Sequence, residues 1–203
     1  MNATHSTRAA TTVAANAATG VGIGPNRIDR VIGVTKAYVT RVGEGPFPTE
    51  IVGPDQERLR ELGREYGTVT GRQRRCGWLD LVGLRYAVRL NGMTSLALTK
   101  LDVLSSFAEL PVCVRYRLRD GTETDEFPAH QSDFHHCEPI YETLPGWQQP
   151  FDGIEDVADL PEAARLYVEF VERAVDVEVC LIGTGADREH VLSRRGVETV
   201  LSS

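Results

Sequence analysis

The sequence predicts an α/β fold, a mixed sheet with flanking helices, and two kinds of segment favour it. Short apolar stretches of strand type, rich in Leu, Ile and Val, lie at 96–100 and 177–182. Amphipathic segments with a helical period lie at 79–88 and 161–174. Strands that alternate with helices build an α/β sheet, and such sheets bind ligands at the carboxyl ends of their strands.

The beginning of the chain is predicted to be irregular. Residues 1–19, mostly Ala and Thr, are expected to be disordered, and one domain is expected at 20–203. Residues 20–25 form a glycine-rich turn whose G-x-G-x-G-P pattern lacks the last glycine of a dinucleotide fingerprint. A tight turn packed against backbone is therefore the alternative to nucleotide binding. The mixed apolar run 28–35 is interpreted as a helix that leads towards a strand.

Loops and helices are predicted to alternate up to residue 92. Two glycines and two prolines at 41–50 exclude a regular element and indicate an ordered loop. Charged residues and leucines at 55–66 indicate an exposed helix. The amphipathic helix at 79–88 is expected to end at Asn91-Gly92, because glycine is the preferred residue after a helix C-terminus.

The remaining elements are predicted from turn and cap signals. A short helical stretch starts at Val103, and Asp120-Gly121 is a turn signal between 111–119 and 122–127, which indicates a hairpin. Pro161 is expected to begin a helix. Its predicted buried side consists of Leu166, Val168, Phe170 and Val171.

Composition limits the classes of partner. With 203 residues, 41% of them hydrophobic, the chain can build one sizeable core. A net charge of −7 argues against an extended nucleic-acid surface, which needs clustered Lys and Arg. No apolar window is long enough to cross a bilayer, and residues 1–19 do not resemble a secretory signal. Neither nucleic acid nor a membrane is expected as a partner.

The cysteines indicate a reducing compartment. Cys76, Cys113, Cys137 and Cys180 are widely spaced without a C-x-x-C pair, so they are interpreted as reduced thiols of a cytoplasmic protein. The run 135–137, His-His-Cys, has no second ligand pair at zinc spacing. It is interpreted as a polar loop, and no metal site is expected.

The strand that ends at Lys100 is the first candidate for ligand binding. Guanine presents N1–H and N2–H as adjacent donors, and the carboxylate of Asp102 can accept from both. The alkyl stem of Lys100 can lie along the base while its ammonium braces a neighbouring loop. The alternative is that the strand ends in Lys and Asp simply to reach solvent.

A glycine loop follows the second strand. The backbone of Gly183-Thr184-Gly185 is unhindered and can approach a flat base or a ribose closely. An ordinary strand-to-helix turn has the same composition. Since both loops follow strands, we expect them to form two walls of one pocket.

A third candidate is a basic loop. Arg72, Arg74 and Arg75 lie together in a polar segment, and guanidinium groups bind phosphates and carboxylates in a bidentate manner. An anion site is therefore predicted here, with a solvated basic loop as the alternative.

Ordered motifs from residue 20 to about 192 resemble the C-terminal half of adenylosuccinate synthetase. The motifs are Lys36-Ala37-Tyr38, Thr40–Gly43, Gly45–Glu50, Thr70–Arg72, Arg74–Asp80, Leu98–Leu104, Glu138–Trp147 and Asp187-Arg188. The resemblance implies the C-terminal portion of that fold, a partial mixed sheet similar to that of P-loop NTPases. It also implies a cytoplasmic homodimer.

Enzymes of this family join IMP and L-aspartate with GTP hydrolysis, so the resemblance implies a role for each loop. The aspartate loop would be Thr68, Val69, Thr70, Gly71, Arg72, Gln73 and Arg74. Arg72 would also reach IMP. The GTP-binding residues would be Arg74, Lys100, Leu101, Asp102, Gly183, Thr184 and Gly185.

The sequence also departs from the family. The phosphate-binding glycine loop, the catalytic aspartate and the catalytic histidine belong to an N-terminal half that has no counterpart here, so no catalytic residue and no magnesium ligand are expected in this chain. Arg8, Val69 and Ala186 replace residues common in the family. Two hypotheses follow: a synthetase portion that is inactive without its N-terminal half, or a non-catalytic guanine-nucleotide-binding or regulatory module.

Overall fold

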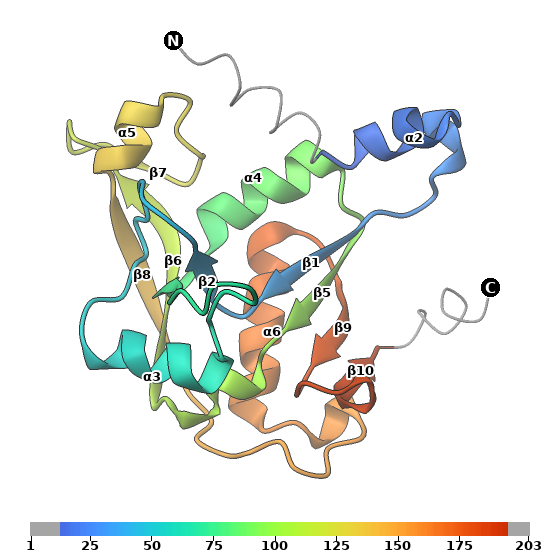
Figure 1. Ribbon diagram of the computed structural model, residues 1–203, viewed down its shortest axis with the longest axis vertical. Helices are drawn as coiled ribbons and strands as arrows, with labels where there is room; N and C mark the ends of the chain where they lie inside the picture. Colours follow the sequence, from blue (N-terminus) through green and yellow to red (C-terminus); the bar gives the residue numbers. More distant parts are fainter. Residues whose placement is uncertain (1–12, 195–203) are drawn as a thin grey trace.

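Figure 1 shows the computed structural model of the chain, which describes residues 13–194. The fold is α/β, as predicted, with helices flanking mixed sheets. The largest parallel arrangement is a four-stranded sheet in the order β1-β5-β9-β10. Its strands are β1 (Ile32–Lys36), β5 (Ser95–Thr99), β9 (Val179–Gly183) and β10 (Val191–Ser193). The first three run parallel to their neighbours and β10 is antiparallel to β9, so the loops after β5 and β9 leave the same edge.

Two further sheets lie beside it. A two-stranded sheet joins β2 (Val39–Arg41) to β3 (Arg75–Gly77). In the other sheet, β6 (Glu109–Arg117) pairs with β4 (Leu79–Asp80), β7 (Glu123–Thr124) and β8 (Glu138–Pro145). The β6–β7 pair is the hairpin that Asp120-Gly121 predicted.

The helices cover the sheets and complete the core. The α-helices are α2 (Ala15–Val21), α3 (Pro54–Gly63), α4 (Leu81–Asn91), α5 (Gln131–His136) and α6 (Glu162–Val175). The 3-10 helices are η1 (Pro25–Arg27), η2 (Asp102–Ser106), η3 (Val157–Asp159) and η4 (Arg188–His190). Helix α6 lies along the parallel sheet (Figure 1), and its buried Val168 and Val171 share one core with Leu96 and Leu98 of β5. That core fixes the strands whose ends carry the candidate ligand residues.

Three predictions about the first elements need correction. Residues 32–35 of the run 28–35 belong to a strand rather than a helix, because they pair in parallel with β5 as part of β1, and residues 28–31 precede that strand without regular structure. The expected disordered start, residues 1–19, contains the beginning of α2 from Ala15; residues 1–12 lie outside the described part. Leu79 belongs to β4, and α4 begins after Asp80, whose carboxylate accepts hydrogen bonds from two amides of the first turn. Helix α4 ends at Asn91 before the left-handed Gly92, as predicted.

Later elements also differ in places. Residues 135 and 136 end helix α5 rather than lying in a polar loop. Leu166 was expected inside but is 46% exposed, and Tyr167 is buried instead, with its hydroxyl donating to Ala37 O (2.7 Å). The sequence pattern did not predict β8. All four cysteines are buried free thiols.

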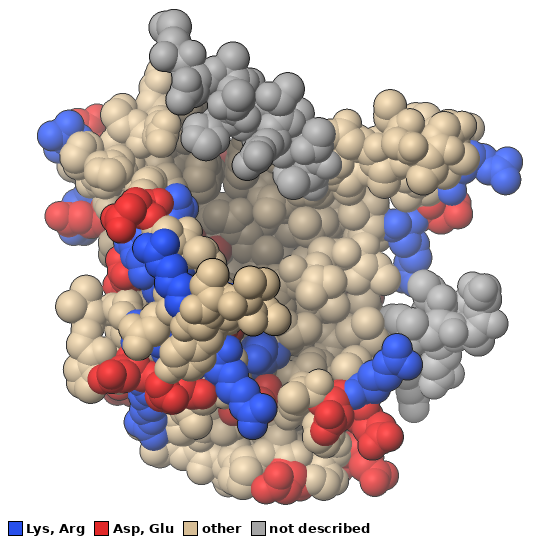
Figure 2. Space-filling model, viewed as in Figure 1, with Lys and Arg blue, Asp and Glu red and all other residues tan. Residues whose placement is uncertain are grey.

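The surface contains mixed charges. Figure 2 shows that basic and acidic side chains are interspersed on the face seen in Figure 1, around a central hollow of mostly uncharged residues. Within residues 13–194, every helix falls short of the length and apolarity that a membrane crossing requires.

Candidate functional site

The ends of β5 and β9 bring two of the sequence candidates together. The amide of Leu101 donates to the carbonyl of Gly183 (3.2 Å), so the Lys100 segment and the glycine loop lie side by side. A Cβ on Gly183 would lie 3.2 Å from the Cα of Thr99, a distance tighter than most real contacts. Gly183 thus permits the close approach of the two strand ends.

Lys100 faces the protein rather than solvent. Its backbone has a positive φ of 63°, which is uncommon for a residue with a side chain. Its ammonium donates to the carbonyl of Gly63 (2.8 Å), at the last turn of α3. The ammonium of Lys100 thus braces the end of α3 rather than a loop, and its predicted contact with a base stays a prediction.

Asp102 begins the 3-10 helix η2 and lines a pocket of about 600 Å³. Its Oδ1 is buried without a hydrogen-bond partner among the described residues. Burial raises the pKa of this carboxyl, and the backbone amides of Asp102 and Val103, together with the Lys100 ammonium, only partly offset that effect. A buried, unpaired carboxylate oxygen is costly, so this position favours a ligand that donates hydrogen bonds.

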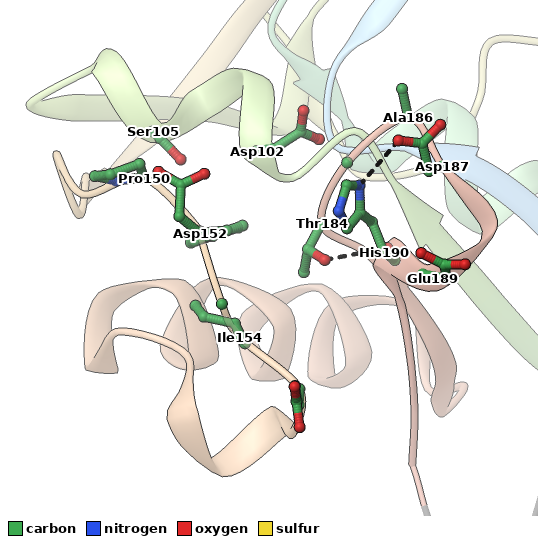
Figure 3. A pocket seen from close by; sticks show the side chains of 14 residues that line it. Asp102, Ser105, Pro150, Asp152, Ile154, Thr184, Ala186, Asp187, Glu189 and His190 are labelled. Atoms are coloured by element: carbon green, nitrogen blue, oxygen red, sulfur yellow. Dashed lines mark hydrogen bonds and ion pairs between the residues drawn. The ribbon is translucent and has the colours of Figure 1, made fainter.

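The other walls of the pocket come from the 150–155 segment and the loop after β9, as Figure 3 shows. The amide and hydroxyl of Thr184 both donate to the carbonyl of His190 (2.8 and 3.1 Å), which closes the loop. A Cβ on Gly185 would overlap the His190 ring. The loop leads into η4 and β10 rather than into an α-helix, so it is not the ordinary strand-to-helix turn.

The pocket is acidic. Its carboxylates are Asp102, Asp152, Glu155, Asp187 and Glu189, and its lining contains neither Lys nor Arg. Such a lining attracts hydrogen-bond donors and repels phosphates. A nucleotide placed here would therefore keep its phosphates outside this pocket. Sequence reasoning missed the contributions of Asp152 and His190, because neither residue stands in a recognisable motif.

The three arginines do not form one cluster. Arg75 points away into the protein: it makes a bidentate pair with Glu50 and donates to the carbonyls of Gly43 (3.2 Å) and Gly45 (3.0 Å). The prediction of a site that uses all three side chains is wrong in this respect, because Arg75 is committed to fixing the 41–50 loop.

Arg72 and Arg74 remain as candidates. The Arg72 guanidinium is exposed and makes no hydrogen bond or ion pair within the described part of the chain. Arg74 donates from Nη1 to Glu65 (2.9 Å), and its buried Nε has no partner among residues 13–194. Residues 68–71 of the predicted aspartate loop form an exposed turn closed by Gly71 N donating to Gly67 O (2.8 Å), and Gln73 forms an isolated antiparallel bridge with Tyr66.

Comparisons with known proteins identify the fold and the family. The family model for adenylosuccinate synthetase matches residues 5–192. The chain belongs to the adenylosuccinate synthetase family. Its relatives include the adenylosuccinate synthetases of Acidothermus cellulolyticus (52% identity over 184 residues) and of Parafrankia sp. (55% over 176 residues). These matches cover 91% and 87% of this chain.

The structural comparison agrees with the sequence comparison. A fully ligated adenylosuccinate synthetase from Plasmodium falciparum superposes with a TM-score of 0.87 at 36% identity, covering 91% of this chain and 44% of that one. The chain spans about two fifths of the length of the curated relatives it matches, 43% and 41% for the two named above. The chain thus shares the family's fold over part of its relatives' length.

Proposed function

We propose that the chain is the C-terminal part of an adenylosuccinate synthetase and that the pocket at the ends of β5 and β9 binds the guanine base of GTP. The buried Oδ1 of Asp102, which has no hydrogen-bond partner among the described residues, carries this proposal. Guanine offers two adjacent donors to such a carboxylate, whereas adenine offers only one donor group and an acceptor at its corresponding edge. Lys100 and Leu101 shape this corner, and Gly183, Thr184 and Gly185 close over the base.

The proposed aspartate loop lies at residues 68–74. The guanidinium of Arg72, which is exposed and has no partner within residues 13–194, would bind the carboxylates of L-aspartate and reach IMP, because bidentate pairing suits such anions. The Nε of Arg74, which no described residue pairs with, supports a contact with the phosphates of GTP. Thr70 stabilises the loop by accepting from Arg72 N through its hydroxyl (3.4 Å).

The complete enzyme would join IMP and L-aspartate with GTP hydrolysis in purine biosynthesis. We assign the catalytic residues and the ligands of Mg²⁺ to the part of the synthetase that this chain does not span. Within residues 13–194, no group of three His, Cys, Asp or Glu side chains is arranged to hold a metal ion. The domain at 20–203 would be inactive alone and would act in a cytoplasmic homodimer.

Calorimetric titration of the purified chain with GDP and with ADP tests the guanine pocket. We expect GDP-selective binding that Asp102→Ala abolishes and that Asp102→Asn weakens at least about tenfold, because the amide replaces an acceptor by a donor. Asp29→Asn is the control: this aspartate is exposed and lies outside the pocket lining, and its neutralisation should leave GDP affinity within about twofold. Equal affinity for GDP and ADP would overturn the proposal.

One observation favours the alternative of a non-catalytic guanine-nucleotide-binding module. Val69, in the proposed aspartate loop, is 96% exposed and offers no side-chain donor to a carboxylate. GDP binding without any L-aspartate or IMP binding, even after the rest of a synthetase is supplied, would support the module.

A further inference from the structure

Glu65 lies just after α3 and is the most enclosed carboxylate near the arginine loop, with 1% of its surface exposed. One oxygen accepts from the ammonium of Lys36 (2.7 Å) and the hydroxyl of Tyr38 (2.6 Å). The other accepts from Nη1 of Arg74 (2.9 Å). The segment 36–38 and the arginine loop therefore meet at the side chain of Glu65.

The charge of Glu65 is maintained by these partners. Burial acts to raise the pKa of the carboxyl, but the hydrogen bonds from Lys36, Tyr38 and Arg74 outweigh it and hold the pKa below its ordinary value. The group is therefore ionised at neutral pH. Without its charge, the cations of Lys36 and Arg74 would face each other without a counterion.

The backbone around Glu65 also fixes the arginine loop. The amide of Arg74 donates to the carbonyl of Glu65 (3.0 Å), and Arg60 Nε donates to the carbonyl of Arg74 (3.0 Å). The amide of Gly67 donates to the carbonyl of Arg72 (2.8 Å). The loop is thus closed on the segment that carries Glu65.

The segment that carries Glu65 also contacts Lys100, at the end of β5 that is proposed to bind guanine. Lys100 donates to the carbonyl of Gly63, two residues before Glu65, and Arg64 between them has a left-handed backbone with φ of 49°. The turn 63–65 therefore touches Lys100 on one side and Arg74 on the other. It links the two regions assigned to the base and to the phosphates.

We propose that Glu65 is a positioning residue of the nucleotide site. It holds Arg74 at a fixed position relative to Lys100, so that one bound nucleotide contacts both side chains. This inference rests on the proposed function, because the contact of Arg74 with phosphate is part of it. Glu65 itself touches no substrate; it acts through Arg74.

Titration of the Glu65→Gln variant with GTP and with guanosine tests the proposal. We expect GTP affinity to fall at least about tenfold and guanosine affinity to change less than about twofold, because only the phosphate contact loses its positioned arginine. If Glu65 acted only through its negative charge, Glu65→Gln would bind GTP more tightly, since removal of a negative charge favours a polyphosphate. A purely structural role would weaken both ligands alike.

The matched control is Glu50→Gln, which neutralises a carboxylate paired with Arg75 instead. It should leave the affinities for both ligands unchanged. Unchanged or tighter GTP binding by Glu65→Gln would overturn the inference, as would equal losses for GTP and guanosine. If Glu65→Gln does not fold, Glu65→Asp keeps the charge and should show the same split with a smaller loss of GTP affinity.

Hydrogen exchange without ligand separates this inference from the proposed function. Amides of residues 67–74 should exchange faster in Glu65→Gln than in wild type or Glu50→Gln, because the carboxylate no longer ties Arg74 to the turn. Equal exchange in all three proteins would overturn the positioning role. A wild-type chain without guanine preference would overturn the proposed function instead.

Discussion

Three arginines within four positions of the chain have three different environments. The guanidinium of Arg72 is exposed and free of partners among the described residues, that of Arg74 is shared with a buried carboxylate, and that of Arg75 is paired with Glu50. The Arg75 guanidinium also lies over the ring of Phe47, 5.4 Å from its centroid. Residue type alone indicated anion binding for all three, whereas the neighbours of each decide which side chain is available.

The Glu50–Arg75 pair predicts a pH-dependent stability. Hydrogen bonds from Arg75 hold the pKa of Glu50 below its ordinary value, so the ionised carboxylate stabilises the fold above the unfolded-state pKa, and this contribution is lost as pH falls through the folded-state pKa. Glu50→Gln should lower the free energy of unfolding by about 1 kcal/mol at about pH 7. The difference should shrink as the pH is lowered to about 2, well below the ordinary glutamate pKa.

Urea unfolding of wild type and Glu50→Gln at both pH values measures this difference. Glu155→Gln is a suitable control, since Glu155 is exposed and has no ion pair with another described residue. A wild-type advantage that stays constant between the two pH values would contradict the assignment.

At the scale of elements, β8 depends on its partner strand more than on its own residues. Its side chains are mostly exposed, and two glutamates and two prolines make it a poor strand by local propensity. It nevertheless pairs with β6 from Glu109↔Pro145 to Arg117↔Glu138. The strand forms because of this long antiparallel pairing. The sequence pattern did not predict it, because a local pattern contains no information about the partner strand.

The end of β8 makes Gly146 sensitive to substitution. Its amide donates to the carbonyl of Ala108 (2.7 Å), and a Cβ at this position would overlap the carbonyl of Phe107. Because the obstacle is backbone, Gly146→Ala should lower the free energy of unfolding by about 2–3 kcal/mol.

Chemical denaturation followed by circular dichroism checks this value. Gly20→Ala serves as the control, because a Cβ there meets nothing within 4 Å and Gly20 lies inside helix α2, where alanine is favoured. Equal stability of Gly146→Ala and wild type would show that the β8 end can shift to make room.

At the scale of the whole molecule, β1 is an edge strand within the described part of the chain. It pairs with β5 on one side only, and Val34 is 77% exposed. An unpaired strand edge offers free backbone groups to another segment. We propose that the part of the synthetase that this chain does not span would pair with this edge, since the chain spans about two fifths of its relatives' length.

Reconstitution tests the proposed division of the enzyme. When the N-terminal part of a related adenylosuccinate synthetase is supplied with this chain, IMP, L-aspartate and GTP should yield adenylosuccinate. The chain alone should form none, because the phosphate-binding and catalytic groups are assigned to the other part. Chromatographic detection of the product measures both cases, with the N-terminal part alone as control. Turnover by this chain alone would contradict the assignment.

The sequence by itself determined the α/β class, the two strand ends and the family, because these depend on local apolar pattern and on ordered motifs. It also located Lys100, Asp102 and the 183–185 loop, since loops at strand ends leave one edge of a parallel sheet. Their roles in binding remain proposals for calorimetry to decide.

Only the tertiary structure decided which charged groups are paired. Glu65 stands in no motif that predicts burial, yet it binds partners 29, 27 and 9 positions away. The local pattern likewise assigned the residues of β1 to a helix. They form a strand instead, because pairing with β5 stabilises it more than the helical propensity of a short apolar run stabilises a helix. The physical reason is common to both: the energy of a buried charge or a strand depends on neighbours that only folding brings into contact.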